Sequence, residues 1–380
     1  MKINEKLTFY EFFAGGGMAR AGLGDNWDCL FANDFDIKKA ETYRKNWGGD
    51  ELIVSDVGTL SIDDIPGKAD LAWASFPCQD LSLAGNRSGL HAQRSGSFWP
   101  FWNLMKALSR QQRAPKIIVL ENVCGALTSH NGADFEAIVD AICKLGYRVG
   151  AMTINADKFL PQSRARLFIV AVRNDLEFDN ISSLIPNPIW HSKSLVVAVQ
   201  SLPEELLKNW IWWSIPDPPR REKNFIDLIE DEPVGVQWKS SEEVERILDM
   251  MSPKNLQKVK DAKLVKKKMV GGVYRRTRNG VQRAEVRFDD VAGCLRTPTG
   301  GSSRQLILIV EGEKIASRLL SAREAARLMG LKESYILPTN YNNAYHLAGD
   351  GVAVPVVAYL ESALLRPILQ NEGISKKKVA

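Results

Sequence analysis

Short apolar runs alternate with amphipathic stretches through the first half of the chain, and this alternation restricts the fold more than any other feature. Two stretches, 37–47 and 135–146, have the 3.6-residue spacing of helices. The apolar runs have the length of strands and occupy residues 7–13, 29–34, 71–76, 116–122, 148–155 and 166–172. Strands that alternate with helices predict an α/β fold with a doubly wound, mostly parallel sheet.

Four of these runs end in glycine or polar residues. The segments are Phe-Ala-Gly-Gly-Gly at 13–17, Ala-Asn-Asp-Phe-Asp at 32–36, Ser-Phe-Pro-Cys-Gln at 75–79 and Glu-Asn-Val at 121–123. Doubly wound sheets bind their ligands at the carboxyl ends of the strands. The sequence therefore predicts a single site to which all four segments contribute.

The pattern changes after the last of these runs, where proline and tryptophan become frequent. Five of the ten tryptophans lie between Trp190 and Trp238. Two alternating runs flank Asn279-Gly280, a pair that predicts a β-hairpin. We expect three segments: a catalytic and cofactor-binding domain at 1–180, a smaller, irregular β-containing domain at 181–320, and a segment at 321–380 that returns to the first domain.

Two helices are predicted in that last segment. Ser321 and Glu324 have the spacing of a capping box, which marks the start of a helix. Residues 351–365 are largely apolar, and we expect them to form a C-terminal helix that packs against the first domain.

Positive charge is concentrated in one part of the second domain. Residues 258–304 contain thirteen Lys and Arg against four Asp and Glu. This balance of +9 leaves −4 for the rest of a chain whose net charge is +5, and such asymmetry is typical of nucleic-acid-binding proteins. A solvated basic face would give the same count, but these charges surround a hairpin and a glycine-rich loop.

The five cysteines are scattered, and none belongs to a Cys-x-x-Cys pair. This pattern argues against a disulfide framework or a zinc site, and it favours a reducing cytoplasm. The chain has no uninterrupted apolar run of about 18 residues, and the N-terminus has no apolar run of signal-peptide length. We therefore expect no membrane association.

The glycine cluster after the first strand predicts a nucleoside cofactor. Glycine lets the backbone approach a ligand closely. Asp34 ends the second strand about 20 residues later, where a ribose hydroxyl would bind, and Asp56 is placed to accept from an adenine amino group. These residues alone do not distinguish NAD from S-adenosylmethionine.

Cys78 favours S-adenosylmethionine. It follows Pro77 at the end of a strand, in a polar loop next to the expected cofactor site. Hydride transfer needs no thiol there, whereas a nucleophilic enzyme does, and nearby positive charge stabilises a thiolate. Arg164 and Arg166 alternate at the start of a strand and so share one face, while Glu121 ends another strand.

The motif order resembles the DNA (cytosine-5)-methyltransferase family. The order is FxGxG, an acidic residue, PCQ, ENV, QxRxR, a glycine-rich loop between arginines, and GxxVxVPV. The resemblance spans nearly the whole chain and leaves a variable gap where that family has its target-recognition domain. PCQ, ENV and QxRxR in this order are highly specific, and the unpermuted arrangement is similar to that of prokaryotic or phage modification enzymes.

The resemblance implies transfer of a methyl group from S-adenosylmethionine, with S-adenosylhomocysteine as product and no metal, to C5 of a flipped-out cytosine in a specific duplex DNA sequence. Cys78 matches the nucleophile that adds to C6. Glu121 matches the residue that supports protonation at N3. Arg164 and Arg166 match residues that hold O2 and stabilise the thiolate.

The resemblance also implies a cofactor pocket with the fold of S-adenosylmethionine-dependent methyltransferases. Its residues would be Phe13, Gly15, Gly17, Asp34, Phe35, Asp56, Val57, Pro77, Asp350 and Gly351. Two positions depart from the family pattern: Met18 stands where the family has a further glycine, and Asp350-Gly351 stand where it has Asn-Ser. We expect the lost Asn amide and Ser hydroxyl to weaken contacts to the cofactor, with backbone groups left to serve in their place.

The second domain would read the DNA sequence, and the loop after Cys78 would close over the DNA. The residues assigned to DNA contacts are Ser82, Arg87, Gln162, Arg275, Arg276, Arg278, Arg283, Arg287, Arg296 and Arg304. Arginine contacts both phosphates and guanine edges. We expect a cytoplasmic monomer, associated with the nucleoid through DNA, and a companion restriction endonuclease that acts separately.

Two other functions fit the sequence. A branch of the same family uses similar motifs to methylate cytosine in transfer RNA, and the large basic gap domain favours duplex DNA only weakly. The third function is that of a DNA-binding protein with a degenerate methyltransferase fold. Intact Cys78, Glu121 and Arg166 argue against it, whereas Met18 and Asp350 are compatible with it.

Overall fold

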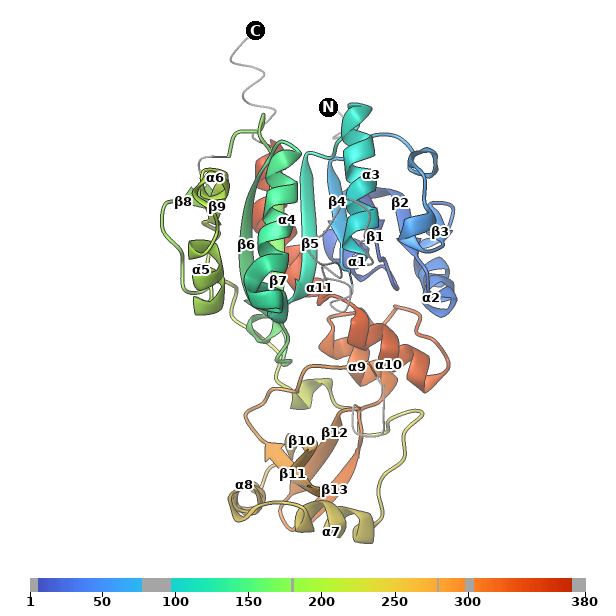
Figure 1. The fold of residues 1–380 in the computed structure, drawn as a ribbon. Helices are drawn as coiled ribbons and strands as arrows, with labels where there is room; N and C mark the ends of the chain where they lie inside the picture. The colour runs from blue at the N-terminus through green and yellow to red at the C-terminus, as the bar shows by residue number, and fades with distance from the viewer. Residues whose placement is uncertain (1–5, 77–96, 179–180, 279, 298–303, 371–380) are drawn as a thin grey trace. The chain divides into compact units, whose positions relative to one another are not determined.

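The alternating runs of the first half form strands of one sheet. The computed structural model describes residues 6–76, 97–178, 181–278, 280–297 and 304–370. Within them, the strands of this sheet are β1 (Leu7–Phe12), β2 (Trp27–Asp34), β3 (Leu52–Val54), β4 (Leu71–Ala74), β5 (Ile117–Val123), β6 (Tyr147–Asn155), β7 (Ala165–Arg173), β8 (Ser182–Ser183) and β9 (Trp210–Trp213). Their order is β3-β2-β1-β4-β5-β7-β6-β9-β8 (Figure 1).

Most neighbouring strands run parallel. β1 pairs in parallel with β2 and β4, and β4 with β5, whereas β7 runs antiparallel to β5 and β8 to β9. The predicted doubly wound, mostly parallel sheet is thus confirmed. In this register Phe12 lies opposite both Asn33 and Ala74, so the carboxyl ends of β1, β2, β4 and β5 meet at one edge of the sheet.

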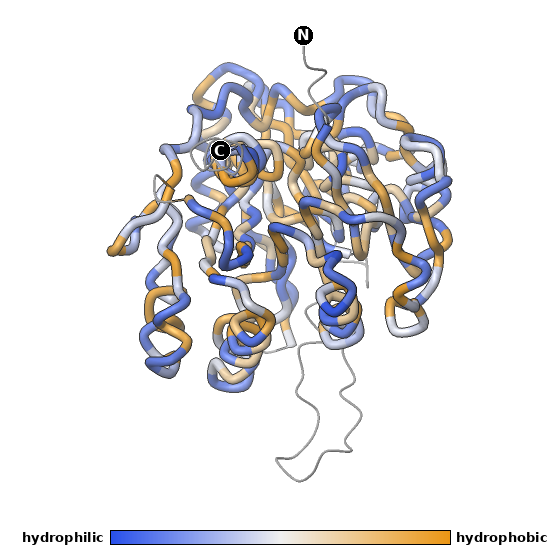
Figure 2. Tube along the Cα trace, turned by 90° about the horizontal axis from the view of Figure 1, so that it is seen from above, coloured by the Kyte–Doolittle hydropathy of each residue, from blue (hydrophilic) through white to orange (hydrophobic). Residues whose placement is uncertain are grey.

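Amphipathic helices bury their apolar faces on this sheet. α3 (Phe98–Arg110), α4 (Ala133–Lys144) and α5 (Lys193–Gln200) share one core with the strands. The remaining helices of this part are α1 (Met18–Leu23), α2 (Ile37–Trp47) and α6 (Glu204–Leu207). Apolar side chains spaced three and four residues apart give α3 one buried face. Figure 2 shows the same pattern, with strands that are largely hydrophobic and helices in which hydrophobic and hydrophilic residues alternate.

The chain divides into two compact units. The first unit contains residues 1–154, 165–218 and 356–380, and the second contains 155–164 and 219–355. The sequence analysis placed boundaries near 180 and 320, but β9 pairs with β6 in the first unit. Residues 181–218 therefore belong to the first unit by contact, and 321–355 belong to the second. The predicted functional division stays a prediction.

An antiparallel sheet forms the core of the second unit. Its strands are β10 (Met269–Arg278), β11 (Val281–Arg287), β12 (Leu306–Glu311) and β13 (Lys314–Leu319), in the order β11-β10-β12-β13. α7 (Ser241–Asp249) and α8 (Pro253–Leu264) pack on this sheet through Ile247 and Val259. The predicted hairpin is confirmed, because Arg278 pairs with Val281 across a two-residue connection.

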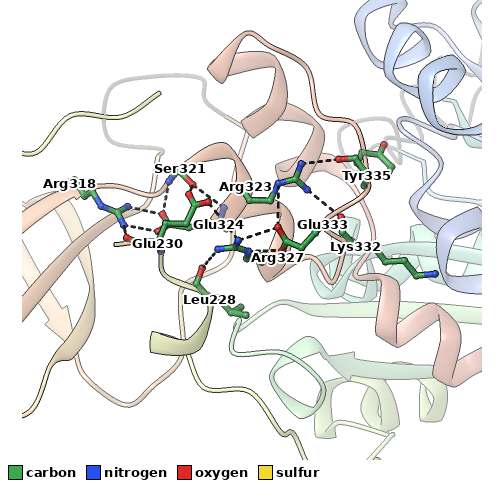
Figure 3. A network of polar contacts seen from close by, with 10 residues as sticks. All are labelled: Leu228, Glu230, Arg318, Ser321, Arg323, Glu324, Arg327, Lys332, Glu333 and Tyr335. Carbon is green, nitrogen blue, oxygen red and sulfur yellow. Dashed lines mark hydrogen bonds and ion pairs between the residues drawn. The ribbon is translucent and has the colours of Figure 1, made fainter. Parts of the chain in front are cut away.

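A buried ion pair joins α9 (Ala322–Leu328) to this sheet. The capping box predicted at Ser321 and Glu324 is present. Arg318 of β13 makes two hydrogen bonds of 2.7 Å with the Glu324 carboxylate, and both side chains are fully buried. Glu230 extends the network, because its main-chain N–H donates to Glu324 and its carboxylate accepts from Ser321 (Figure 3). Loss of one partner would leave a buried charge unpaired, so the network fixes α9 to β13.

The last helices are α10 (Tyr341–Asp350) and α11 (Val354–Leu360). Among the described residues, 341–370 form one segment that is long and apolar enough, by composition alone, to cross a membrane. However, 56% of its most apolar window is buried, and core helices of soluble proteins pass the same test. From Val356 onward the segment belongs to the first unit, and Glu361 there accepts a hydrogen bond of 2.9 Å from the Trp27 indole.

Candidate active site

The glycine-rich turn after β1 is held by Asp34 and Trp47. The main-chain N–H of Gly15 donates to the Asp34 carboxylate at 2.8 Å, and the Trp47 indole donates to the Gly16 carbonyl at 2.9 Å. Gly15 and Gly17 have φ angles of 56° and 76°, which favour glycine. A β-carbon at Gly17 would collide with the Trp47 ring. The turn therefore has no room for a side chain at Gly17, where Trp47 packs against the backbone.

Asp34 and Phe35 end β2 with opposite exposure. Asp34 is 6% exposed, and its two carboxylate oxygens accept from the main-chain N–H groups of Gly15 and Asp36 at 2.8 Å each. Burial raises the pKa of Asp34. Phe35 is 67% exposed. A carboxylate oxygen can accept a second hydrogen bond, and an exposed aromatic ring can stack on a planar ligand.

Asp56 caps the short turn that follows β3. Its Oδ1 accepts from the Gly58 N–H at 2.7 Å, and its other oxygen has no hydrogen bond to a described residue. Val57 is buried beside it. Phe13 has a φ angle of 57° and lies with its ring centroid 6.5 Å from that of Phe76.

Met18 departs from the family pattern without exposing its side chain. It begins α1 and is 2% exposed. The extra side chain is therefore accommodated in the core, and the effect on cofactor affinity stays a prediction.

A carboxylate–guanidinium pair lies at the end of β5. Arg166 Nε is 3.2 Å from Glu121 Oε1, and the side chains are 16% and 8% exposed. The antiparallel register of β5 and β7 places Val123 opposite Arg166, which sets Glu121 on the neighbouring diagonal. Asn122 donates from Nδ2 to the Phe76 carbonyl at 3.1 Å. Glu121 and Arg166 are thus brought together, and Asn122 ties them to the end of β4.

Four predicted site residues, Pro77, Cys78, Ser82 and Arg87, lie outside the described residues. Phe76 is the last described residue before them, and it is buried. Asn122 is a further site residue, and its place between Glu121 and Val123 in the ENV segment was the sequence signal for it.

Glu11 is a buried acid that the sequence analysis also did not single out. It is 1% exposed, and one carboxylate oxygen accepts from the Arg20 main-chain N–H at 3.3 Å, while the other has no partner among the described residues. Burial raises the pKa of Glu11 to about 8, and the nearby Asp34 charge acts in the same direction. An acid within an otherwise apolar strand was the sequence signal for this residue.

Gln162 is fully buried in the second unit. Its Nε2 donates to the Leu328 carbonyl at 2.5 Å, and its Oε1 accepts from the Leu295 N–H at 3.3 Å. The predicted contact between Gln162 and DNA would require these bonds to break.

Arg164 has partners quite different from those of Arg166. It is 3% exposed and donates to the main-chain carbonyls of Leu295, Gly349 and Gly351 at 3.1, 2.9 and 2.7 Å. β7 begins only at Ala165, so the strand alternation that predicted a shared face does not extend to Arg164. These contacts make Arg164 a positioning residue of the second unit, and its predicted contact with cytosine stays a prediction.

Asp350 and Gly351 belong to the second unit, at the end of α10. Asp350 is exposed and accepts from the Thr297 hydroxyl at 3.1 Å. The other predicted cofactor residues that are described belong to the first unit. The cofactor contacts of Asp350 and Gly351 stay predictions.

The arginines of the hairpin divide between its two faces. Cross-strand partners share a face, and Arg276 lies directly opposite Arg283. Alternation places Arg287 on that same face. Arg275 lies opposite the buried Ala284, on the face that packs on the core.

The two arginines of the glycine-rich loop also differ. Arg296 is exposed, whereas Arg304 is half-buried and donates to the Asn342 side chain at 2.6 Å. Residues 298–303 between them lie outside the described residues. Elsewhere, no group of three or more His, Cys, Asp or Glu among the described residues is placed to hold a metal ion.

Comparison with protein families gives a match across almost the whole chain. The model of the C-5 cytosine-specific DNA methylase family matches residues 7–366. The matched residues include the glycine-rich turn, the Glu121–Arg166 pair and the whole second unit.

Related proteins are named as Type II methyltransferases. M.BsuFI of Bacillus subtilis is 37% identical over 185 residues, which are 48% of this chain and 43% of that protein. The match to M.Bsp6I likewise spans only 58% of that protein, so the chain spans about half the length of these two relatives. M.HpaII of Haemophilus parainfluenzae is 29% identical over 363 residues, 93% of this chain and 88% of that protein.

Solved structures share the fold. Dnmt2 methyltransferase of S. pombe has a TM-score of 0.59 at 20% identity and covers 95% of this chain and 99% of that one. The methyltransferase EhMeth of Entamoeba histolytica has a TM-score of 0.60 at 15% identity, with 96% and 98% covered. At these identities the comparison shows a common fold, that of a methyltransferase sheet with a second, smaller unit.

Proposed function

Because the chain belongs to the C-5 cytosine-specific DNA methylase family, we propose that it transfers a methyl group from S-adenosylmethionine to C5 of a cytosine in duplex DNA. The observation that carries this proposal is the pair of Glu121 and Arg166, 3.2 Å apart at the end of β5. Asn122 bonds this strand end to Phe76, two residues before the proposed nucleophile Cys78.

The first unit has a surface that fits a nucleoside cofactor. Gly15 and Gly17 give the turn after β1 a backbone without side chains at these positions, and the exposed ring of Phe35 is available for stacking. Asp34 and Asp56 each keep acceptor capacity for a ribose hydroxyl and an adenine amino group. S-adenosylmethionine bound there would supply an electrophilic methyl group. Its product would be S-adenosylhomocysteine, and the reaction needs no metal.

The remaining chemistry falls to side chains of the chain. C5 of cytosine is a poor nucleophile, so we propose that the Cys78 thiolate adds to C6. Glu121 supports the proton at N3 that relieves the negative charge of the ring, and Arg166 holds Glu121 while its guanidinium faces O2. C5 then accepts the methyl group, and loss of the C5 proton with departure of the thiolate restores the aromatic ring. None of these atoms is accessible inside a duplex, so the cytosine is flipped out.

The second unit supplies the surface for DNA. Arg276 and Arg283 face one another on an exposed side of the hairpin, and we propose that they contact DNA together with the loop bearing Ser82 and Arg87. The names of the relatives support a role in a restriction–modification system, with a separate endonuclease, in the cytoplasm where the DNA lies. We propose that the enzyme acts as a monomer, which sedimentation of the protein with and without DNA would test.

Transfer of labelled methyl from S-adenosylmethionine tests the proposed reaction. The acceptors are unmethylated duplex DNA and, in parallel, transfer RNA, with nucleoside digestion to identify the product. Cys78→Ser should abolish transfer. Cys143→Ser is the matched control, because burial raises the pKa of the Cys143 thiol to about 11 and such a thiol is unreactive; this variant should retain transfer.

Each outcome has a distinct meaning. Labelled 5-methylcytosine in DNA alone, lost in Cys78→Ser and kept in Cys143→Ser, supports the proposal. Label in transfer RNA alone would mean that transfer RNA, and not duplex DNA, is the substrate. Binding of DNA without transfer to either acceptor would mean a methyltransferase fold that has lost its chemistry.

A further inference from the structure

We propose that a polar cavity in the second unit binds a phosphate group of the DNA backbone; this inference rests on the proposed function and names a contact beyond the reacting base. The cavity has a volume of about 410 Å³ and lies where α8 meets the β10–β11 hairpin. Four cationic side chains line it: Lys254 and Lys258 from α8, and Arg276 and Arg287 from the hairpin. The two lysines were not singled out by the sequence analysis.

The charge of the lining is positive after its acids are counted. Glu285 is the acidic residue of the lining, and Arg287 is bonded to Asp289. Lys254 and Arg276 make no hydrogen bond or ion pair with another described residue. Four cations against Glu285, with Arg287 bonded to Asp289, leave the lining with a positive balance, which is the electrostatic condition for an anion site.

The pairing of the hairpin adds an independent observation. Arg276 and Arg283 are direct cross-strand partners, and like charges at such positions destabilise a sheet. Both side chains are exposed. A bound anion next to Arg276 would relieve this repulsion in addition to Glu285, which lies on the same face of the hairpin.

The wall of the cavity is fixed by contacts to the edge strand. Val286 of β11 donates its N–H to Asn255 at 3.2 Å, and its carbonyl accepts from Lys258 at 2.9 Å. These bonds satisfy backbone groups that an edge strand leaves unpaired, and they hold Lys258 at the cavity. On the opposite side a β-carbon at Gly293 would collide with the Tyr274 ring, so the glycine leaves room for the ring that lines the cavity.

The lining favours a phosphate over a base edge or an apolar ligand. Small-molecule sites are mostly lined by apolar groups, whereas here Val286 is the aliphatic member of the described lining. Lysine acts on phosphate as a point charge. The Asn255 amide, which base reading would use, is already bonded to Ser252, Lys258 and Val286. The contact should therefore contribute affinity without sequence preference.

The salt dependence of DNA binding tests the site. Full-length wild-type protein and variants are titrated with two short fluorescent duplexes of unrelated sequence, and with transfer RNA, over a series of NaCl concentrations. Lys254→Gln should reduce the slope of log affinity against log salt by about 0.9, the contribution of one phosphate of B-DNA, and equally on both duplexes. Lys254→Arg should keep the wild-type slope.

Lys260→Gln is the matched control. Lys260 is exposed on the same helix, carries the same charge and does not line the cavity, so its loss should leave the slope unchanged.

Equal changes of the salt slope in Lys254→Gln and Lys260→Gln would overturn the proposal. A change of the slope for one duplex sequence alone, or for transfer RNA alone, would also overturn it. If the wild-type protein binds duplex DNA with a slope that depends on Lys254 but transfers no methyl group, the proposed reaction fails and the phosphate site stands.

Discussion

At the scale of single residues, the candidate site depends on how carboxylates are buried. Glu121 and Glu11 have similar exposures of 6% and 1%, yet their partners differ. Glu121 faces the Arg166 guanidinium at 3.2 Å, whereas one oxygen of Glu11 has no partner among the described residues. Burial favours the protonated form of a carboxylate, and at Glu11 it outweighs the opposing charge of Arg20. Glu11 is thus suited to holding α1 as a neutral acid, whereas Glu121 forms an ion pair with Arg166 at the end of β5.

The Glu11 pKa predicts a pH-dependent stability. Burial raises the pKa from 4.5 to about 8, so the folded protein binds a proton that the unfolded chain releases between these values. The free energy of unfolding should therefore fall as pH rises from about 5 to 8, by up to about 4 kcal/mol at about 1.4 kcal/mol per pKa unit. Glu11→Gln should remove this part of the pH dependence and be the more stable form at pH 8.

Urea unfolding of both proteins at a series of pH values measures the difference between them. All other titrating groups contribute equally to the two curves, so the difference isolates Glu11. Parallel curves for wild type and Glu11→Gln would contradict the assignment.

At the scale of elements, the turn between β1 and α1 depends on a long-range contact. Gly17 and Gly24 both have positive φ angles, 76° and 77°, but a β-carbon meets the Trp47 ring only at Gly17 and open space at Gly24. In each Gly→Ala variant, backbone strain should lower the free energy of unfolding by about 1–2 kcal/mol. In Gly17→Ala the collision with Trp47 should lower the free energy of unfolding by a further 1–3 kcal/mol, roughly the cost of overpacking. This variant should also bind S-adenosylmethionine more weakly.

Urea unfolding and calorimetric titration with S-adenosylmethionine give the two quantities. Gly24→Ala serves as the control for strain alone. If the two variants were equally stable and bound the cofactor equally, Trp47 would not be what holds the turn.

Some elements could be predicted from local sequence patterns alone. Residues 37–47 were predicted as a helix from their periodicity, and α2 has these bounds. The Asn279-Gly280 hairpin and the Ser321 capping box were likewise predicted from turn and cap chemistry, and both are present. Each depends on residues within a few positions of one another, because backbone preferences and side-chain periodicity act over that distance.

At the scale of the whole molecule, the second unit is assembled from two separate parts of the chain. Residues 155–164 lie between two strands of the first unit, yet Gln162 and Arg164 bond to the backbone of the second. A fragment of residues 219–355 alone would leave those buried carbonyls unpaired, at about 1–3 kcal/mol each.

Urea unfolding of three fragments tests this dependence. The fragment 219–355 should be the least stable. Joining 155–164 to it through a Gly/Ser linker should raise its free energy of unfolding by several kcal/mol, on the order of 1 kcal/mol for each restored hydrogen bond. The matched control carries the same linker with Gln162→Ala and Arg164→Ala and should resemble the fragment alone. Equal stability of all three would show that the unit does not need residues 155–164.

The sequence by itself determined the alternation of strands and helices, the parallel sheet and the hairpin. These features follow from local periodicity and from the geometry that every parallel sheet shares. Only the tertiary structure decided that Arg164 bonds to Gly349, 185 positions away, that Arg166 faces Glu121, and that Glu11 is buried without a full set of partners. Such contacts depend on which distant segments pack together, and burial and hydrogen bonding then set the charge and role of each side chain.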